Sequence, residues 1–144
     1  MRIHALLVLG VGLLIAADAK NDDFAKKELK DLSGTYVMVS GESKAEKLSE
    51  ERIKEAKLEM DGDKYSANFG GDTVKGTLKI DPTKAPKEID ATDGEGKTML
   101  GIYKFEKGQF TVCFAPSGKE RPKEFSVKVG TGDFIHVWKK KTKD

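Results

Sequence analysis

The chain has few of the residues that supply most covalent and metal chemistry. Its 144 residues include one cysteine, Cys113, and two histidines, His4 and His136. One cysteine cannot form an internal disulfide, so a packed core must stabilise the fold unless Cys113 bridges to another chain. No His or Cys spacing is typical of a zinc site. We therefore predict no metal and no cofactor.

Neither sign of charge is in large excess. The chain has 26 lysines and arginines against 24 acidic residues, a formal net charge of +2, and the two signs are interspersed. A surface built for nucleic acid or anionic lipid would carry a more one-sided charge. We predict no nucleic-acid partner, and we interpret the basic cluster at 139–143 as a solvated tail.

Only the N-terminus carries a long apolar run. Arg2 precedes an apolar segment at 5–17, and small residues then lead to Ala19. This pattern is typical of a secretory signal peptide, and the run is shorter than the roughly 20 apolar residues of a membrane span. We predict a signal peptide at 1–19, cleaved near Ala19. The mature chain at 20–144 would be one extracytoplasmic domain, periplasmic or secreted, without a stable membrane anchor.

Two short helices are predicted ahead of most of the strands. Ala25, Leu29 and Leu32 fall at helical spacing within a charged segment. Ser49 is placed to cap a second helix of about two turns, with Glu50 and Glu51 in its first turn. Neither segment is long enough to form a helical domain.

Most of the remaining chain alternates with a period of two. Asp61-Gly62 is a strong hairpin signal, and beyond it Val74, Leu78 and Ile80 share one strand face while lysines and threonines take the other. Such a pattern predicts about eight to ten short strands in an antiparallel barrel or sandwich. The predicted strands lie at 35–40, 56–60, 64–69, 73–80, 88–92, 98–106, 109–115, 125–129 and 133–139.

Several short segments carry a resemblance to a known family. They are Leu32-Ser33-Gly34-Thr35-Tyr36, Asp81-Pro82-Thr83-Lys84, Gly101-Ile102-Tyr103, Cys113-Phe114-Ala115 and Arg121-Pro122 followed by Phe125. From about Leu29 to Lys140 the chain resembles the small lipocalin-like domain that is abundant in planctomycete bacteria. The resemblance implies a lipocalin-like β-barrel, and the family has no assigned function to carry over. Tyr36 stands where that family usually has tryptophan.

Two nucleotide-binding or catalytic alternatives fit the sequence poorly. Around Gly118-Lys119, Cys113 stands where a P-loop needs its first glycine, and Glu120 follows the lysine. Cys113 lies in the middle of a predicted strand, where a cysteine most often packs as a small apolar side chain. A thiol enzyme using Cys113 with His136 remains an alternative, because two strands can bring these residues together.

The candidate ligand residues are mostly aromatic. His136 shares a predicted strand face with Phe134 and Trp138, and a few polar groups among aromatic rings can orient a ligand inside a barrel. Tyr36, Tyr65 and Tyr103 are equally open to a packing role or a ligand role, and Arg121 is open to loop support or ligand contact. From these residues we predict a candidate ligand site of Tyr36, Tyr103, Arg121, His136 and Trp138.

Three functions remain open at this point. The first is a non-catalytic exported module that holds a small apolar or amphipathic, hydrophobic molecule in its barrel. The second is a structural or protein-interaction domain with a filled core, since barrels of about eight strands occur in both forms. The third is the cysteine-dependent enzyme. We predict no catalytic residue, and the identity of a ligand or protein partner is open.

Overall fold

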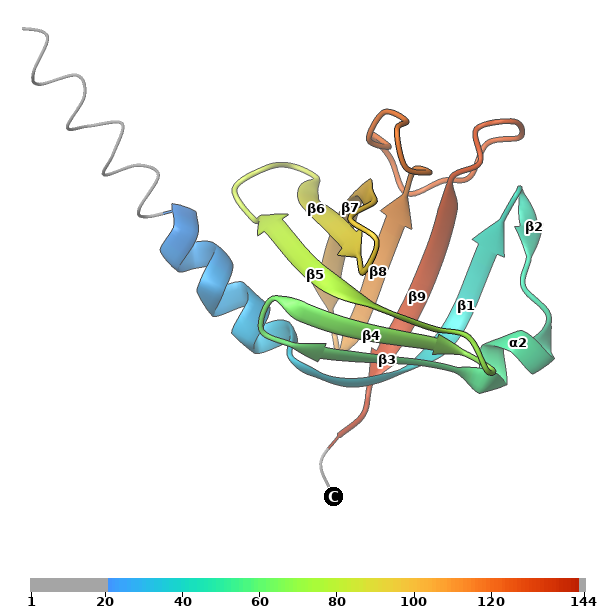
Figure 1. Cartoon of the computed structure of the whole chain (residues 1–144), viewed down its shortest axis with the longest axis horizontal. Helices are drawn as coiled ribbons and strands as arrows, with labels where there is room; N and C mark the ends of the chain where they lie inside the picture. The colour runs from blue at the N-terminus through green and yellow to red at the C-terminus, as the bar shows by residue number, and fades with distance from the viewer. Residues whose placement is uncertain (1–20, 143–144) are drawn as a thin grey trace, which may run out of the picture.

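Antiparallel pairing of successive strands closes the chain into a barrel (Figure 1). The computed structural model describes residues 21–142, so the predicted signal peptide at 1–19 lies outside the described residues. Residues 21–32 form an N-terminal helix. The elements that follow are β1 (Gly34–Ser43), β2 (Glu46–Lys47), α2 (Glu50–Glu55), β3 (Ala56–Asp61), β4 (Lys64–Phe69), β5 (Thr73–Asp81), β6 (Lys87–Asp93), β7 (Thr98–Glu106), β8 (Gln109–Phe114) and β9 (Phe134–Lys140).

The barrel closes because β1 pairs with both β3 and β9. Tyr36, for example, lies opposite Leu58 on β3 and opposite Lys140 on β9. Eight strands complete the wall, and the two-residue β2 only extends the sheet beside the end of β1. The predicted all-β, lipocalin-like barrel with two short helices is confirmed. Closure leaves no long unpaired edge in the wall.

Local sequence explains the hairpins. Between β3 and β4, Gly62 adopts a φ of +58°, which favours glycine, and its amide donates to the Ser33 hydroxyl at 2.9 Å. On β3 every second side chain is buried, with Leu58 and Met60 inside and Lys57 outside. On β5 Leu78 is buried on the predicted inner face. The strand period therefore separates the barrel interior from its surface.

The N-terminal helix closes one end of the barrel. Leu29 and Leu32 belong to the buried apolar core, and the Tyr36 hydroxyl donates to the Leu32 carbonyl oxygen at 2.6 Å. The Lys140 ammonium donates to the Asp31 carbonyl oxygen at 2.9 Å, from the last residue of β9. Figure 1 shows this helix in blue at one side of the barrel, away from the orange loops that join β8 to β9. No helix in residues 21–142 has the length and apolar character of a membrane span.

Glu28 is the polar anchor of this helix. Its carboxylate accepts hydrogen bonds from the Tyr103 hydroxyl and from the Lys87 ammonium. Burial, and then the hydrogen bond to Glu28, raise the pKa of Tyr103 above its usual value. Tyr103 lies on β7 and Lys87 begins β6, so one helical side chain joins the helix to two strands.

The predicted strand at 125–129 is absent. Residues 115–133 form no strand and instead lie over the outer face of the barrel. There the Lys104 ammonium lies 5.0 Å from the centroid of the Phe125 ring, and the Cys113 sulfur lies 3.8 Å from the Ser126 carbonyl oxygen. We call residues 115–133 the outer flap. The apolar alternation of 125–129 is real, since Phe125 and Val127 are half-buried. It does not produce a strand because β7, β8 and β9 already have both neighbours in the closed wall.

A Glu28→Ala substitution tests the anchor. It leaves the buried Tyr103 hydroxyl without its acceptor, so we expect the free energy of unfolding to fall by about 1–3 kcal/mol. Amide exchange should quicken across residues 21–32 more than in the barrel strands. Lys26→Ala, on an exposed residue of the same helix, is the matched control. Equal exchange rates in the two variants would show that Glu28 does not hold the helix.

Candidate ligand pocket in the barrel

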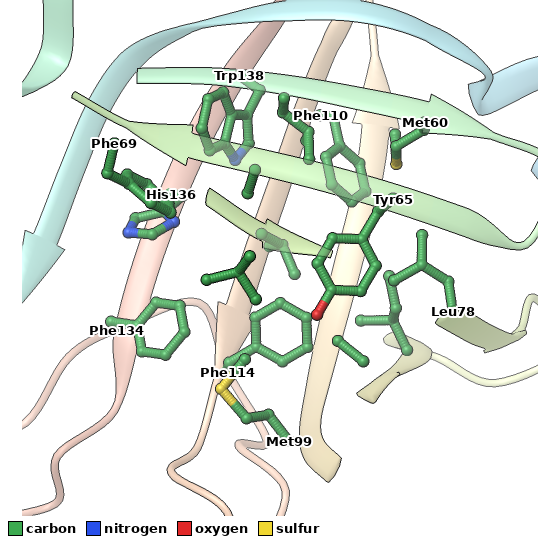
Figure 2. Close-up of a pocket in the computed structure, with 16 residues that line it drawn as sticks. Met60, Tyr65, Phe69, Leu78, Met99, Phe110, Phe114, Phe134, His136 and Trp138 are labelled. Atoms are coloured by element: carbon green, nitrogen blue, oxygen red, sulfur yellow. The ribbon is translucent and has the colours of Figure 1, made fainter. Parts of the chain in front are cut away.

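A cavity of about 280 Å³ lies inside the barrel (Figure 2). Sixteen side chains from seven strands, β3 to β9, line it, and nearly all of them are aliphatic or aromatic. Protein interiors leave few voids larger than a water molecule. The cavity is therefore larger than an ordinary packing void, and its lining is of the kind that suits an apolar molecule.

The cavity lies toward the end of the barrel opposite the N-terminal helix. The lining residues nearest that end are Val74 at the start of β5, Phe114 at the end of β8 and Phe134 at the start of β9. In antiparallel neighbours, the start of one strand and the end of the next share one end of the sheet. Val74 is 40% exposed, so the cavity reaches solvent at this end, which we call the mouth.

Four aromatic side chains form one wall of the cavity. Phe134, His136 and Trp138 alternate along β9, and Phe69 faces them from the end of β4 (Figure 2). Ring centroids are 4.9 Å apart for Phe134 and His136, 5.8 Å for His136 and Trp138, and 5.7 Å for Phe69 and His136. These tilted and edge-on arrangements are the favoured ones for aromatic pairs. We call these four residues the aromatic wall.

His136 is a neutral member of this wall at neutral pH. Burial lowers its pKa from 6.5 to about 4, because the charged imidazolium loses its hydration inside the barrel. Gly41 leaves room beside the ring, since a Cβ at residue 41 would lie 3.3 Å from the His136 Cδ2 atom and 2.6 Å from Leu48 Cδ1. The ring thus contributes aromatic surface and uncharged nitrogen atoms.

Tyr65 places a hydroxyl in the cavity without a partner. It lies on β4, its oxygen is buried, and it makes no hydrogen bond with any described residue. Burial, and then the negative charge of Asp93, raise its pKa, so the phenol keeps its proton at neutral pH. Opposite Tyr65 on β5 is Gly76, where a Cβ would lie 1.8 Å from the Thr92 carbonyl oxygen. Only glycine permits this close approach of β5 and β6 beside the Tyr65 ring.

The predicted site residues divide between the pocket and its surroundings. His136 and Trp138 line the cavity, whereas Tyr36 and Tyr103 do not. The rings of these two tyrosines each lie 6.0 Å from Phe110, which does line the cavity, and their hydroxyls bond to the N-terminal helix. They therefore support the floor of the pocket. Tyr65, which the sequence left open to either role and which is not in the predicted site, lines the cavity. Strand alternation alone gives no measure of depth along the barrel.

Arg121 lies outside the pocket and holds the outer flap. Its guanidinium donates to the carbonyl oxygens of Ile89 at 3.1 Å and Gly101 at 2.8 Å, residues paired across β6 and β7. It also lies 2.8 Å from an Asp90 carboxylate oxygen and 3.7 Å from Glu88. Of the two roles that the sequence left open, the geometry favours loop support. The planar fork of arginine suits such simultaneous bonds.

Cys113 and His136 lie on opposite faces of the barrel wall. Val112, which lines the cavity, is paired with His136, so its neighbour Cys113 points outward beneath the outer flap. Burial, and then Asp133, raise the pKa of Cys113 to about 11, which disfavours a reactive thiolate. The thiol and the imidazole do not form a nucleophile and base pair. Residues 21–142 also bring together no group of three His, Cys, Asp or Glu suited to a metal ion.

Comparisons with known proteins found no match to this chain among protein-family models, curated proteins or solved structures.

Arg121→Ala should loosen the outer flap. The guanidinium makes charge-assisted bonds, so its loss should lower local stability by about 1.5–3 kcal/mol and raise the iodoacetamide alkylation rate of Cys113 at least about tenfold. Lys123→Ala, at an exposed flap residue, is the control and should react as slowly as the unaltered protein. An unchanged rate in Arg121→Ala would assign the flap's hold to other contacts.

The pKa of His136 predicts an acid-dependent loss of stability. Its folded pKa lies below the unfolded value of 6.5, so as the pH falls the unfolded chain takes the proton first. The stabilisation is complete above pH 6.5 and is lost by about pH 4, a contribution of about 3 kcal/mol to the free energy of unfolding. Between pH 7 and pH 4, the free energy of unfolding measured by chemical denaturation should therefore fall by about 3 kcal/mol less in His136→Phe than in the unaltered protein. Parallel losses in both proteins would contradict the lowered pKa.

Proposed function

We propose that this chain is an exported, non-catalytic, lipocalin-like binding module that carries a small apolar or amphipathic molecule in its barrel. The observation that carries the proposal is the cavity of about 280 Å³ inside a closed barrel, with an apolar lining and a mouth at one end. The sequence resemblance to the planctomycete lipocalin-like domain supports the same class of protein.

The cavity favours a carrier over a domain with a filled interior. Two lining residues, Ala67 and Ala91, are small where larger apolar side chains would fill the space. An empty apolar cavity costs on the order of 20 cal/mol per Å³, which amounts to several kcal/mol for this one. Water gains little from a space that offers it few polar partners. A ligand that fills the space would recover that free energy.

The chemistry of the lining supports binding without catalysis. Tyr65 and His136 are the titratable side chains among its described residues, and both are neutral at neutral pH. A general acid or base works best with a pKa near the operating pH, and the pKa of His136 lies well below it. The one thiol faces the opposite side of the wall.

Export is the second part of the proposal. The apolar segment after Arg2 and the small residues ending at Ala19 support a cleaved signal peptide. In an oxidising compartment a single cysteine buried beneath the outer flap is protected from forming a disulfide with other chains. The mass of the mature protein from its own host would give the cleavage site directly.

Native mass spectrometry tests the carrier function. The mature protein, recovered from the extracytoplasmic fraction of its host, would be weighed under native and denaturing conditions. We expect a reproducible additional mass that leaves on denaturation, because the apolar cavity would retain its ligand through purification. Equal masses, with no binding of uncharged aromatic probes to the purified protein, would leave the domain with a structural or protein-interaction function.

Filling the cavity should separate stability from binding. Ala91→Phe adds a ring between Leu78 and Met99, both of which line the cavity, so we expect the unliganded protein to gain about 0.5–2 kcal/mol of unfolding free energy. Binding of N-phenylnaphthylamine, followed by its fluorescence, should weaken at least about tenfold, which corresponds to about 1.4 kcal/mol. Thr77→Phe, on the exposed face of β5, is the control. A strongly destabilised Ala91→Phe protein would mean that this space is already filled.

A further inference from the structure

The polar groups of the cavity define the ligand more narrowly than its apolar lining does. We infer that the pocket selects a flat, uncharged molecule with one hydrogen-bond-accepting oxygen, which the Tyr65 hydroxyl binds while the ring system lies on the aromatic wall. This inference rests on the proposed carrier function and adds the chemical class of the ligand.

Tyr65 provides a directed contact for the ligand. Its hydroxyl is buried and has no partner among the described residues, and Figure 2 shows it pointing into the pocket on the side of Phe114. A buried hydroxyl without a partner costs free energy, which a hydrogen bond recovers. The other two tyrosine hydroxyls bond to the N-terminal helix, so among the tyrosines Tyr65 alone offers its proton to a ligand.

The charge of the lining excludes a carboxylate ligand. Within the described part of the chain, no lysine or arginine lines the cavity, so a bound anion would lie buried without a counter-ion. The charge that acts on the Tyr65 hydroxyl is negative, since Asp93 raises the pKa of Tyr65 through its field. Asp93 itself is held in a turn, where its carboxylate accepts from the amides of Glu95 and Lys97 at 2.9 and 3.0 Å.

The aromatic wall sets the shape of the ligand. Its rings already contact one another, with Phe69 and Trp138 centroids 6.1 Å apart and Phe114 and Phe134 centroids 5.7 Å apart nearby. They present one continuous surface, whereas a site for a cation would have separate aromatic rings on several sides of it. A cation would also leave the Tyr65 proton without an acceptor. A neutral ring system with a carbonyl, ether or ester oxygen meets both requirements.

Four naphthalene probes of similar size test this selectivity. Acetylnaphthalene carries the acceptor oxygen, isopropenylnaphthalene replaces that oxygen by carbon, naphthoate carries a negative charge and naphthyltrimethylammonium a positive one. Calorimetric titration of the mature protein should show acetylnaphthalene binding about tenfold more tightly than isopropenylnaphthalene, the effect of about one net hydrogen bond. Both charged probes should bind at least about tenfold more weakly than acetylnaphthalene.

Tyr65→Phe is the decisive variant. It should remove the preference for acetylnaphthalene and leave the affinity for isopropenylnaphthalene unchanged, because the ring is kept. Tyr36→Phe is the matched control, since that hydroxyl lies outside the pocket, and it should keep the preference. A preference that survives in Tyr65→Phe, or a charged probe that binds as tightly as the ketone, overturns the inference and leaves the carrier function standing. Failure of all four probes to bind the unaltered protein overturns both.

Discussion

The pairing of β1 with β9 is the constraint on which the rest of this structure depends. It joins Tyr36 near one end of the wall to Lys140, and Ser43 near the other end to Phe134. Once it forms, every long strand has two neighbours and every strand residue faces either the lumen or the outside. The interior is then limited to what the inward side chains and the two ends can fill. A segment that joins two wall strands, such as the outer flap between β8 and β9, can then only cover the wall.

The two ends of the barrel interior are filled in different ways. At one end the N-terminal helix inserts Leu29 and Leu32, and its backbone and Glu28 satisfy the inward tyrosine hydroxyls. At the other end the short helix α2 packs Ile53 against the core, and the cavity is bordered by half-buried rings such as Phe134. The unpartnered hydroxyl of Tyr65 and the void occur in the same half. Both features follow from leaving that end open.

Much of the wall was predictable from the sequence, because strand alternation and glycine turns are local signals. The Asp61-Gly62 hairpin and the shared face of Phe134, His136 and Trp138 needed only neighbouring residues. Depth along the barrel is not local, since it depends on the register of all the strands together. The sequence therefore predicts Tyr36 and Tyr103 as ligand residues, whereas in the structure their hydroxyls bond to the N-terminal helix and neither lines the cavity. The false strand at 125–129 has the same origin, because its pattern gives no information about whether a partner strand is free.

The polar content of the lumen connects stability to selectivity. Most of its surface is apolar, so any compact apolar molecule gains free energy by leaving water for it. That gain does not discriminate among ligands, because burial of apolar area is not directional. Discrimination among ligands requires a polar group that lacks a hydrogen-bond partner when the pocket is empty. The Tyr65 hydroxyl is such a group. Tyr103 has the same phenol on the same inner surface, but its hydroxyl already donates to Glu28. The difference between these two tyrosines comes from where the N-terminal helix lies, because its Glu28 accepts from Tyr103. The element that stabilises one half of the barrel thus also determines which hydroxyl is left without a partner among the described residues.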